Sequence, residues 1–169
     1  MSILKRIPQN TNFLHKNKFK LVFPKVPNVE FFCQNVIIPG ISQQPVIAEN
    51  PFNKLYVSSI KTEFEPLVVN FLIDEDMKTW FEVYNWIMGI TFPHSFEEYG
   101  AMKKKGLYSD ISIIVLSNNN IPNINFTFYH AFPLNMGALD FSSASECENQ
   151  QFILPVVFRY DTYIPRRMT

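Results

Sequence analysis

Apolar residues at every second position are the feature that most limits how this chain can fold. The run PLVVNFLID places four of them on one side of an extended strand: Leu67, Val69, Phe71 and Ile73. The run KFKLVF, residues 18–23, repeats this alternation, with a lysine on each side of its first phenylalanine. A strand with one apolar face must bury that face against another layer. The pattern therefore predicts a core between β-sheets.

Further strands are predicted from β-branched and aromatic runs that end at turn residues. VEFFCQNVII, residues 29–38, closes at Pro39-Gly40 and is expected to form a hairpin with residues 18–23 around residues 25–28. SDISIIVLS and NINFTFYHAF flank a turn at residues 118–120. LDFSS, residues 139–143, and the long run FILPVVFRYDTYI, residues 152–164, complete the set.

One amphipathic helix is predicted over residues 74–89. Asp74 can cap its start, and the helix dipole favours Glu75 and Asp76 in the first turn. Gly89 marks its end. The apolar face is predicted from residues at helical spacing: Met77, Trp80, Phe81, Tyr84, Ile87 and Met88. These elements together predict a mainly β fold, an antiparallel β-sandwich or split barrel with one flanking α-helix.

Composition indicates that the folded chain assembles with other chains. Its 169 residues suit a single domain, and 47% of them are apolar whereas only 18% are charged. A monomer of this composition exposes apolar patches, which usually mark contacts between chains. Residues 1–15 show no sustained period and are expected to form an irregular basic arm.

Charge and cysteine content argue against several classes of protein. Fifteen basic and fifteen acidic residues balance, unlike in a strongly basic nucleic-acid binder or membrane-surface protein. Six basic residues and no acid precede position 30, so this segment can attract the acidic middle of the chain. Cys33 and Cys147 are far apart, which favours buried thiols in a reduced intracellular chain. We expect no signal peptide and no stable membrane insertion.

The sequence shows no combination of residues that predicts an enzyme, a metal site or a cofactor. His15, His94 and His130 fall on an arm, a loop and a strand, in no spacing used by zinc or a catalytic triad. Helix capping explains the acids at residues 74–76, and a solvated loop explains the lysines at residues 103–105. The five glycines are scattered and form no phosphate-binding loop.

Three stretches carry a resemblance when they are taken in order. FKLVFPKVPNVEFFCQNVIIPGIS runs through Cys33 to the Pro39-Gly40 turn, and PLVVNFLIDEDMKTWFEVYNWIMGI passes from a strand through acids into a helix. FPLNMGALDFSSASECENQQFILPVVFRYD has Phe132-Pro133 and Gly137 before its last long strand. Over about residues 16–163, the chain resembles the tail tube proteins of contractile-tailed bacteriophages, including the related subunits that start the tube at the baseplate.

The resemblance implies hexameric rings that stack into a tube, whose inner sheets join into one continuous β-barrel. The implied partners are other copies of the chain, the tail sheath, the tape-measure protein, and baseplate or terminator proteins. Genomic DNA would pass through without sequence-specific binding, in a virion tail assembled in the host cytoplasm. A Phe before Pro133, where a Trp is frequent, and the basic arm leave two roles open. These are the repeating tube subunit and an initiator ring at the baseplate end.

In that family, a long loop after the second strand reaches neighbouring subunits and helps rings to stack. By position, this role falls on residues 41–60, whose proline, glutamine and asparagine content also predicts a long extended loop. The candidate stacking residues are Gln43, Gln44, Pro45, Asn50, Pro51, Phe52 and Asn53.

Polar residues on alternating strands are candidates for a lumen wall: Lys61, Glu63, Asn123, Asn125 and Thr127. Their neighbours can point into the core. A wall that conducts DNA should lack a basic stripe, because each phosphate that Lys or Arg neutralises tightens binding. Two interpretations from other classes remain, a monomeric ligand-binding β-barrel with a Phe-rich pocket and a small enzyme, for which no motif is present.

Overall fold

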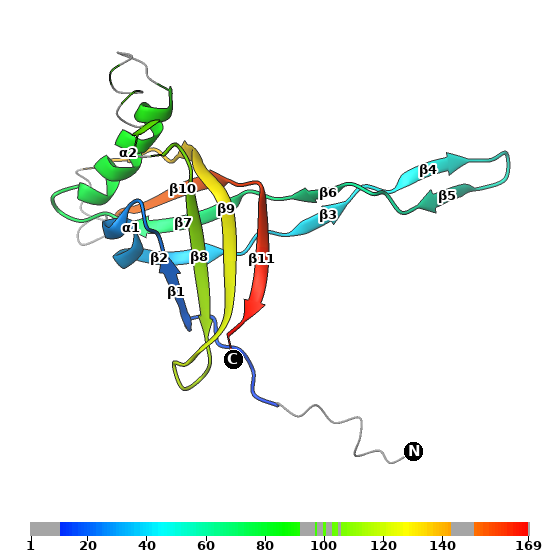
Figure 1. Ribbon diagram of the computed structural model, residues 1–169, viewed down its shortest axis with the longest axis horizontal. Coiled ribbons are helices and arrows are strands. Elements are labelled where there is room, and N and C mark those ends of the chain that lie inside the picture. Colours follow the sequence, from blue (N-terminus) through cyan, green and yellow to red (C-terminus); the bar gives the residue numbers. More distant parts are fainter. Residues whose placement is uncertain are drawn as a thin grey trace.

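The computed structural model describes residues 11–91, 97, 100, 103–104, 106–142 and 151–168. Two antiparallel sheets, one long helix and a projecting hairpin make up this part of the chain (Figure 1). The elements in chain order are β1 (Phe19–Val22), α1 (Pro27–Phe31), β2 (Cys33–Ile37), β3 (Ile41–Gln43), β4 (Val46–Glu49), β5 (Lys54–Val57), β6 (Thr62–Phe64), β7 (Leu67–Leu72), α2 (Lys78–Thr91), β8 (Ser109–Leu116), β9 (Pro122–Met136), β10 (Ile153–Arg159) and β11 (Thr162–Arg167).

The two sheets share one strand. The front sheet has the order β1-β8-β9-β11, and the back sheet has the order β9-β10-β7-β2. All of these pairings are antiparallel, and the strands of the two sheets cross in Figure 1. The sheets do not close into a barrel within one chain. This confirms the predicted class, a mainly β antiparallel sandwich with a flanking helix.

Strand β9 passes from one sheet to the other at His130. This residue has a left-handed backbone with a φ of 54°, which is uncommon outside glycine and disrupts a regular ladder. Two carboxylates hold the bend. The His130 backbone N–H donates to Asp110 Oδ1 at 3.0 Å, and the His130 Nδ1 lies 2.8 Å from Asp161 Oδ2. The pairing of β8 with β9 shifts register beside this point.

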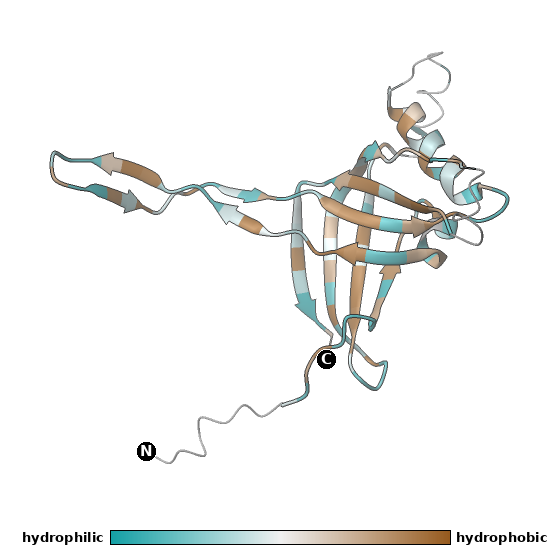
Figure 2. Ribbon diagram, turned by 180° about the vertical axis from the view of Figure 1, so that it is seen from behind, coloured by the Kyte–Doolittle hydropathy of each residue, from teal (hydrophilic) through white to brown (hydrophobic). Residues whose placement is uncertain are grey.

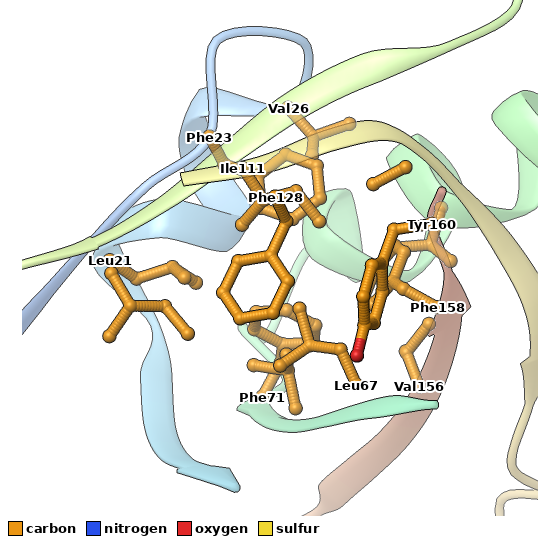
Figure 3. Packing of buried hydrophobic residues seen from close by; sticks show 14 of the residues in the cluster. Leu21, Phe23, Val26, Leu67, Phe71, Ile111, Phe128, Val156, Phe158 and Tyr160 are labelled. Atoms are coloured by element: carbon orange, nitrogen blue, oxygen red, sulfur yellow. The ribbon is translucent and has the colours of Figure 1, made fainter. Parts of the chain in front are cut away.

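The core lies between the sheets and under α2. Its largest fully buried side chains include Phe23, Phe71, Phe128 and Phe158, one or more from each layer (Figure 3). From α2, Trp86 packs edge-on against Phe23 at 5.8 Å between ring centroids. The indole N–H of Trp86 donates to the Leu107 carbonyl at 3.0 Å, so this buried polar group is satisfied. The predicted apolar face of β7 is confirmed, since Leu67, Val69 and Phe71 are fully buried.

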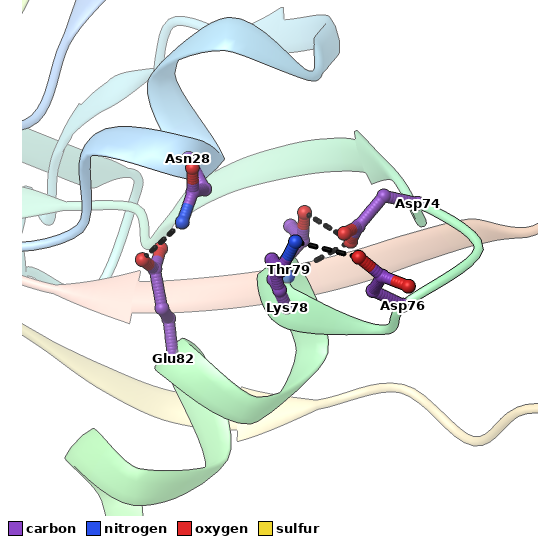
Figure 4. A network of polar contacts seen from close by, with 6 residues as sticks. All are labelled: Asn28, Asp74, Asp76, Lys78, Thr79 and Glu82. Carbon is purple, nitrogen blue, oxygen red and sulfur yellow. Dashed lines mark hydrogen bonds and ion pairs between the residues drawn. The ribbon is translucent and has the colours of Figure 1, made fainter.

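The helix begins later than its sequence predicts, although Asp74 does cap it. Both the backbone N–H and the hydroxyl of Thr79 donate to Asp74 Oδ1 at 3.0 Å (Figure 4). Glu75 and Asp76 lie in the turn before the helix rather than in its first turn, and α2 continues past Gly89. Helix α1 is tied to α2 through Asn28 Nδ2, which donates to Glu82 Oε1 at 2.6 Å.

The buried face of α2 also differs from the predicted one. Thr79, Val83, Trp86 and Gly89 are the buried residues, whereas Phe81 is half exposed. The helix carries apolar residues around most of its circumference, so periodicity alone could not select the stripe that meets the sheets. Trp80 and Tyr84 stack on each other at 4.9 Å between ring centroids, beside the core.

Three predicted strand arrangements differ from the structure. The first strand does not form a hairpin with residues 29–38, because β1 pairs with β8 and β2 pairs with β7. Residues 27–31 instead form α1, which begins with Pro27 at its first position, where the missing N–H costs nothing. The predicted strand at residues 139–143 is absent from its described part, residues 139–142. The long last run is broken between β10 and β11, where the chain moves from the back sheet to the front.

The cap of α2 gives a pH-dependent contribution to stability. The Thr79 backbone N–H holds the pKa of the Asp74 carboxyl below its ordinary value. A depressed pKa of an acid stabilises the folded state above the unfolded pKa, and this contribution is lost as the pH falls through the folded pKa. We expect Asp74→Ala to lower the free energy of unfolding by about 1 kcal/mol at pH 7. Asp74→Asn should keep most of the cap, because an amide oxygen also accepts the bond.

Urea unfolding of the three proteins between pH 3 and pH 7 measures both effects. The difference between the original chain and Asp74→Asn should shrink as the pH falls below about 4, the ordinary pKa of an aspartic acid. An unchanged free energy of unfolding in Asp74→Ala would show that the helix does not depend on this cap.

Candidate functional site

Residues 41–64 form a long β-hairpin that projects from the sandwich, where a loop without regular structure is predicted. Strand β3 pairs with β6 near the body, and β4 pairs with β5 toward the tip (Figure 1). Together with Gly40 and Glu65, which pair at its base, we name this segment (residues 40–65) the projecting hairpin. Asn50 builds its turn, since its side-chain oxygen accepts the backbone N–H groups of Phe52 and Asn53 at 3.0 and 2.7 Å.

The projecting hairpin contains several hydrophobic stretches (Figure 2), and most of their side chains are exposed. Phe52 at the tip is 96% exposed and Ile60 is fully exposed. Six more apolar residues are at least half exposed: Ile41, Val46, Ile47, Leu55, Tyr56 and Val57. An isolated two-stranded hairpin is marginally stable in water, and patches of this kind mark contacts with other chains. The geometry therefore fits a segment that is covered in an assembly.

The predicted stacking residues all lie on this hairpin, but their positions and contacts differ. Gln43 ends β3 and its side-chain amide donates to the Ser59 carbonyl across the hairpin. Gln44 donates to Glu63 Oε2 at 3.2 Å. Pro45 lies between β3 and β4, and residues 50–53 form the turn at the tip. The glutamines and Asn50 thus shape the hairpin, while Phe52 is its most exposed ring.

Aromatic side chains hold the base of the projecting hairpin on the sandwich. The Tyr160 hydroxyl donates to the Glu65 carbonyl at 2.7 Å, and the Tyr163 hydroxyl donates to the Pro39 carbonyl at 3.3 Å. Phe64 packs on both tyrosine rings, at 6.1 and 5.5 Å between centroids. We name Phe64, Tyr160 and Tyr163 the aromatic clamp. It joins the hairpin to the corner between β10 and β11.

Backbone contacts close the same base. Gly40 and Glu65 face each other across the two limbs, where the Glu65 N–H donates to the Gly40 carbonyl and the Gly40 N–H donates to Glu65 Oε2, both at 3.2 Å. A Cβ at Gly40 would lie 2.9 Å from Glu65 Oε2, so any larger residue here requires the Glu65 carboxylate to move. Burial raises the pKa of Tyr160 to about 12, so its hydroxyl remains a hydrogen-bond donor at neutral pH.

The front sheet has two open edges, β1 and β11. On β1, the Leu116 N–H donates to the Lys18 carbonyl at 2.9 Å, so alternate residues from Lys18 turn their backbone groups toward β8. The backbone groups of Phe19, Leu21 and Phe23 consequently face the open edge. On β11, the Met168 N–H donates to the Asn123 carbonyl at 2.8 Å. The same alternation turns the backbone groups of residues 163, 165 and 167 outward.

Each open edge has one blocked position. The Phe23 N–H on the β1 edge already donates to Glu30 Oε2 at 3.2 Å. Pro165 on the β11 edge has no N–H to donate. Native sheets use such devices to limit unwanted pairing of edges. The remaining outward groups leave a short ladder for a partner strand on each side.

The predicted lumen residues fall into two separate groups. Asn123, Asn125 and Thr127 share the outward face of β9 in the front sheet, and the alternate residue Phe128 is fully buried as predicted. Lys61 and Glu63 lie instead on the projecting hairpin. Three cations also occupy the outward face of the front sheet, which the sequence did not predict: Lys18, Lys20 and Arg166.

The remaining predicted features take little part in these surfaces. Cys33 is half buried and burial raises its thiol pKa to about 11, while Cys147 and His94 lie outside the described residues. Lys103 and Lys104 are exposed. In the described segments, no three His, Cys, Asp or Glu side chains are grouped so that they could hold a metal ion. No helix in those segments has the length and apolar character needed to cross a membrane.

Solved structures with this fold come from contractile injection systems. The tube-terminating cap of the anti-feeding prophage aligns with a TM-score of 0.71 and 11% identity, over 99% of this chain and 100% of that one. The sheath/tube terminator of the extracellular contractile injection system PVC aligns with a TM-score of 0.66 and 14% identity, over 93% and 99%. At these identities the likeness shows the fold. The chain therefore shares its fold with tube-terminating proteins of contractile injection systems.

The sequence identifies the family. Residues 5–166 match the model of the phage tail tube protein family, and the chain belongs to that family. It is also 28% identical over 121 residues to the tail tube terminator protein of Enterobacteria phage T4. That alignment spans 69% of this chain and 66% of the relative, slightly less than two thirds of the relative's length. The predicted resemblance to tail tube proteins is thereby confirmed.

Removing one hydroxyl from the aromatic clamp tests how the projecting hairpin is held. Tyr160→Phe should lower the free energy of unfolding by about 1 kcal/mol, the net worth of one hydrogen bond. Hydrogen exchange should speed up at β3 and β6. The original chain should lose stability as the pH rises from about 10, the ordinary tyrosine pKa, toward the raised value of about 12, because deprotonation then favours the unfolded chain.

Tyr56→Phe is the matched control, because Tyr56 lies on the same hairpin but is 69% exposed. It should change neither the free energy of unfolding nor the exchange at β3 and β6. Equal exchange at the hairpin base in both variants would contradict a clamp that acts through the Tyr160 hydroxyl.

Proposed function

We propose that the chain forms a homohexameric ring that terminates the tail tube of a contractile bacteriophage. The observation that carries the proposal is the pair of complementary open edges on the front sheet. The terminator role is supported by the T4 relative and by the cap and terminator structures that share the fold. A solved baseplate structure with this fold, aligned at a TM-score of 0.61, was symmetrised six-fold.

The strand directions permit the edges of neighbouring copies to pair. Four strands that are all antiparallel alternate in direction, so β1 and β11 run in opposite directions. When copies are placed side by side, β1 of one meets β11 of the next as a further antiparallel pair. Pairing of this kind removes exposed edges, and a heterologous contact that closes on itself gives a ring.

The faces of the two edges match as well. On both edges, the residues with outward backbone groups point their side chains inward, as Leu21 and Tyr163 do toward the core. Directly opposite residues in a sheet carry side chains on the same face. Pairing of β1 with β11 therefore keeps the inner and outer faces continuous from copy to copy, which is what a joined barrel wall needs.

The blocked positions favour one register of the joint. When Phe23 stands opposite Pro165, the occupied N–H and the missing N–H face each other and cost a single place in the ladder. Leu21 then stands opposite Arg167 and both hydrogen bonds of that pair can form. A shift of two residues that sets Pro165 opposite Leu21 spreads the same two lost hydrogen bonds over two pairs, whereas the preferred register confines them to one.

In this assembly the projecting hairpin contacts neighbouring subunits, and its exposed apolar residues become buried. The lumen is lined by the outward face of the front sheet, which carries Asn123, Asn125 and Thr127. Tape-measure protein and genomic DNA pass through, without recognition of DNA sequence. The sheath and other tail proteins are the outer partners, and the ring belongs to the virion tail after assembly in the host cytoplasm.

Disulfide formation across the joint tests the ring and its register together. Cysteines are introduced in pairs in a chain with Cys33 and Cys147 changed to Ser. Lys20→Cys with Met168→Cys should cross-link, because these residues face each other in the preferred register. They form a pair without backbone hydrogen bonds, which brings Cα atoms to about 4.5 Å, within the range of a disulfide.

Denaturing gels should show a ladder that ends at the hexamer and collapses on reduction. Lys20→Cys with Arg166→Cys and Val22→Cys with Met168→Cys report the two registers shifted by two residues and serve as controls of equal chemistry. A ladder from either control pair alone would assign a different register. Only monomer with all three pairs would contradict a joint between β1 and β11.

Electron microscopy separates a terminating ring from the repeating tube subunit, which a solved sheath-tube complex of the same fold represents (TM-score 0.66). The purified full chain at high concentration should give single rings or short stacks, because a terminator must not support continued growth. Long tubes formed by the chain alone would assign it to the repeating subunit instead. A monomer under all salt conditions would contradict both roles.

A further inference from the structure

The outward face of the front sheet is polarised along its strands. At the end near the β8–β9 turn it carries Lys18, Lys20 and Arg166. At the other end lie Asp110 and Asp161, which hold His130. Between them the face is mostly uncharged, with Ser112, Thr127 and Ile164 opposite one another. The positive charge is therefore confined to one end.

The strand register places these cations in a row. Lys20 stands opposite Ile114, Ile114 opposite Asn125, and Asn125 opposite Arg166. Neighbouring strands lie about 4.8 Å apart, so Lys20 and Arg166 are separated by roughly 14 Å across the sheet. Lys18 lies one step further toward the turn, where its Nζ contacts Asn120 Oδ1 at 2.6 Å.

Little negative charge compensates this row. Glu30 is the acid nearest to it, with its Oε1 at 3.9 Å from the Lys20 Nζ and its Oε2 already bound to the Phe23 N–H. Lys18 and Arg166 form no ion pair with any residue that the structure describes. Lys18, Lys20 and Arg166 are named here the cationic belt.

Ring closure would concentrate the same charge further. Joining β1 to β11 in the preferred register places Arg166 of one copy diagonal to Lys20 of the next, and the register shifted toward Arg166 sets the two directly opposite. Like charges at such positions destabilise a sheet. A ring of this construction gains stability when a polyanion lies against the belt, because the repulsion across every joint is then screened.

We propose that the cationic belt binds the phosphate backbone of duplex DNA at one mouth of the ring. This inference rests on the proposed function, since it needs the front sheet to face the lumen. A duplex presents negative charge at all angles around its axis, so it can meet a belt that repeats around a ring without matching its symmetry. Arg166 can bind a phosphate with two parallel hydrogen bonds, and Asn123 adds an uncharged donor.

The belt modifies the expectation that a conduit wall lacks basic residues. A basic stripe along the whole strand, repeated in many stacked rings, would hold DNA along its length. A belt at one end of a single terminal ring makes contact over a short stretch of duplex only. Such a contact can hold the DNA in the channel without trapping its full length.

Binding of a 30-bp duplex to the full chain, followed by fluorescence anisotropy between about 0.05 and 0.2 M salt, tests the proposal. Lys18→Gln with Arg166→Gln should weaken binding at least tenfold at the lower salt and flatten the salt dependence, because fewer counterions are released. Lys103→Gln with Lys104→Gln removes two charges from exposed positions outside the front sheet and should change neither quantity. Two duplexes of unrelated sequence should bind equally.

Native mass spectrometry of the same samples separates this inference from the proposed function. Intact rings that bind no duplex, or that bind it equally in both double variants, would overturn the belt as a DNA contact. Absence of rings would instead contradict the hexamer. Poly-glutamate that displaces the duplex at an equal charge concentration would assign the belt to an acidic protein and overturn the DNA proposal.

Discussion

The bend of β9 at His130 is the constraint on which the rest of the structure depends. A straight strand of this length would extend one sheet and leave the apolar faces of the two sheets without a common core. The bend lets a single strand pair with β8 and β11 in front and with β10 behind. A left-handed histidine is unfavourable by itself, and the contacts to Asp110 and Asp161 stabilise it. Those contacts are local, whereas the core that they permit runs through the whole sandwich.

The open edges combine free backbone groups with partial protection. Sheets usually protect an edge with charge, proline or a covering element. Here Glu30 and Pro165 each block one backbone position, and the other outward groups remain available. A foreign strand that pairs with either edge meets a gap in its ladder. Another copy of the same chain can align the two gaps, which confines the lost hydrogen bonds to a single pair of the ladder.

Much of the sandwich could be predicted from sequence, because alternation along single strands is a local signal. The core face of β7 follows from it, and the β8–β9 hairpin follows from two β-rich runs on either side of an asparagine turn. Pairing between distant strands could not be predicted, which is why β1 was expected beside β2 rather than beside β8. For the candidate site, only the location at residues 41–60 could be predicted. The strand pairs of the hairpin could not, because this segment lacks the regular alternation that marks a strand. The aromatic clamp was not predicted, because Tyr160 and Tyr163 lie at the break between β10 and β11, where the side-chain alternation of a single strand is interrupted.

The aromatic clamp bears on how far the projecting hairpin can tilt on the sandwich. Each limb of the projecting hairpin is about ten residues long, which corresponds to roughly 33 Å of extended strand. A swing of about 5° at the base would then move the tip by about 3 Å, the length of a hydrogen bond. The stiffness that matters for the tip must therefore reside at the base, where Phe64, Tyr160, Tyr163 and the Gly40–Glu65 pair are gathered. In this geometry, the side chains that fix the direction of Phe52 lie at the opposite end of the hairpin from Phe52 itself.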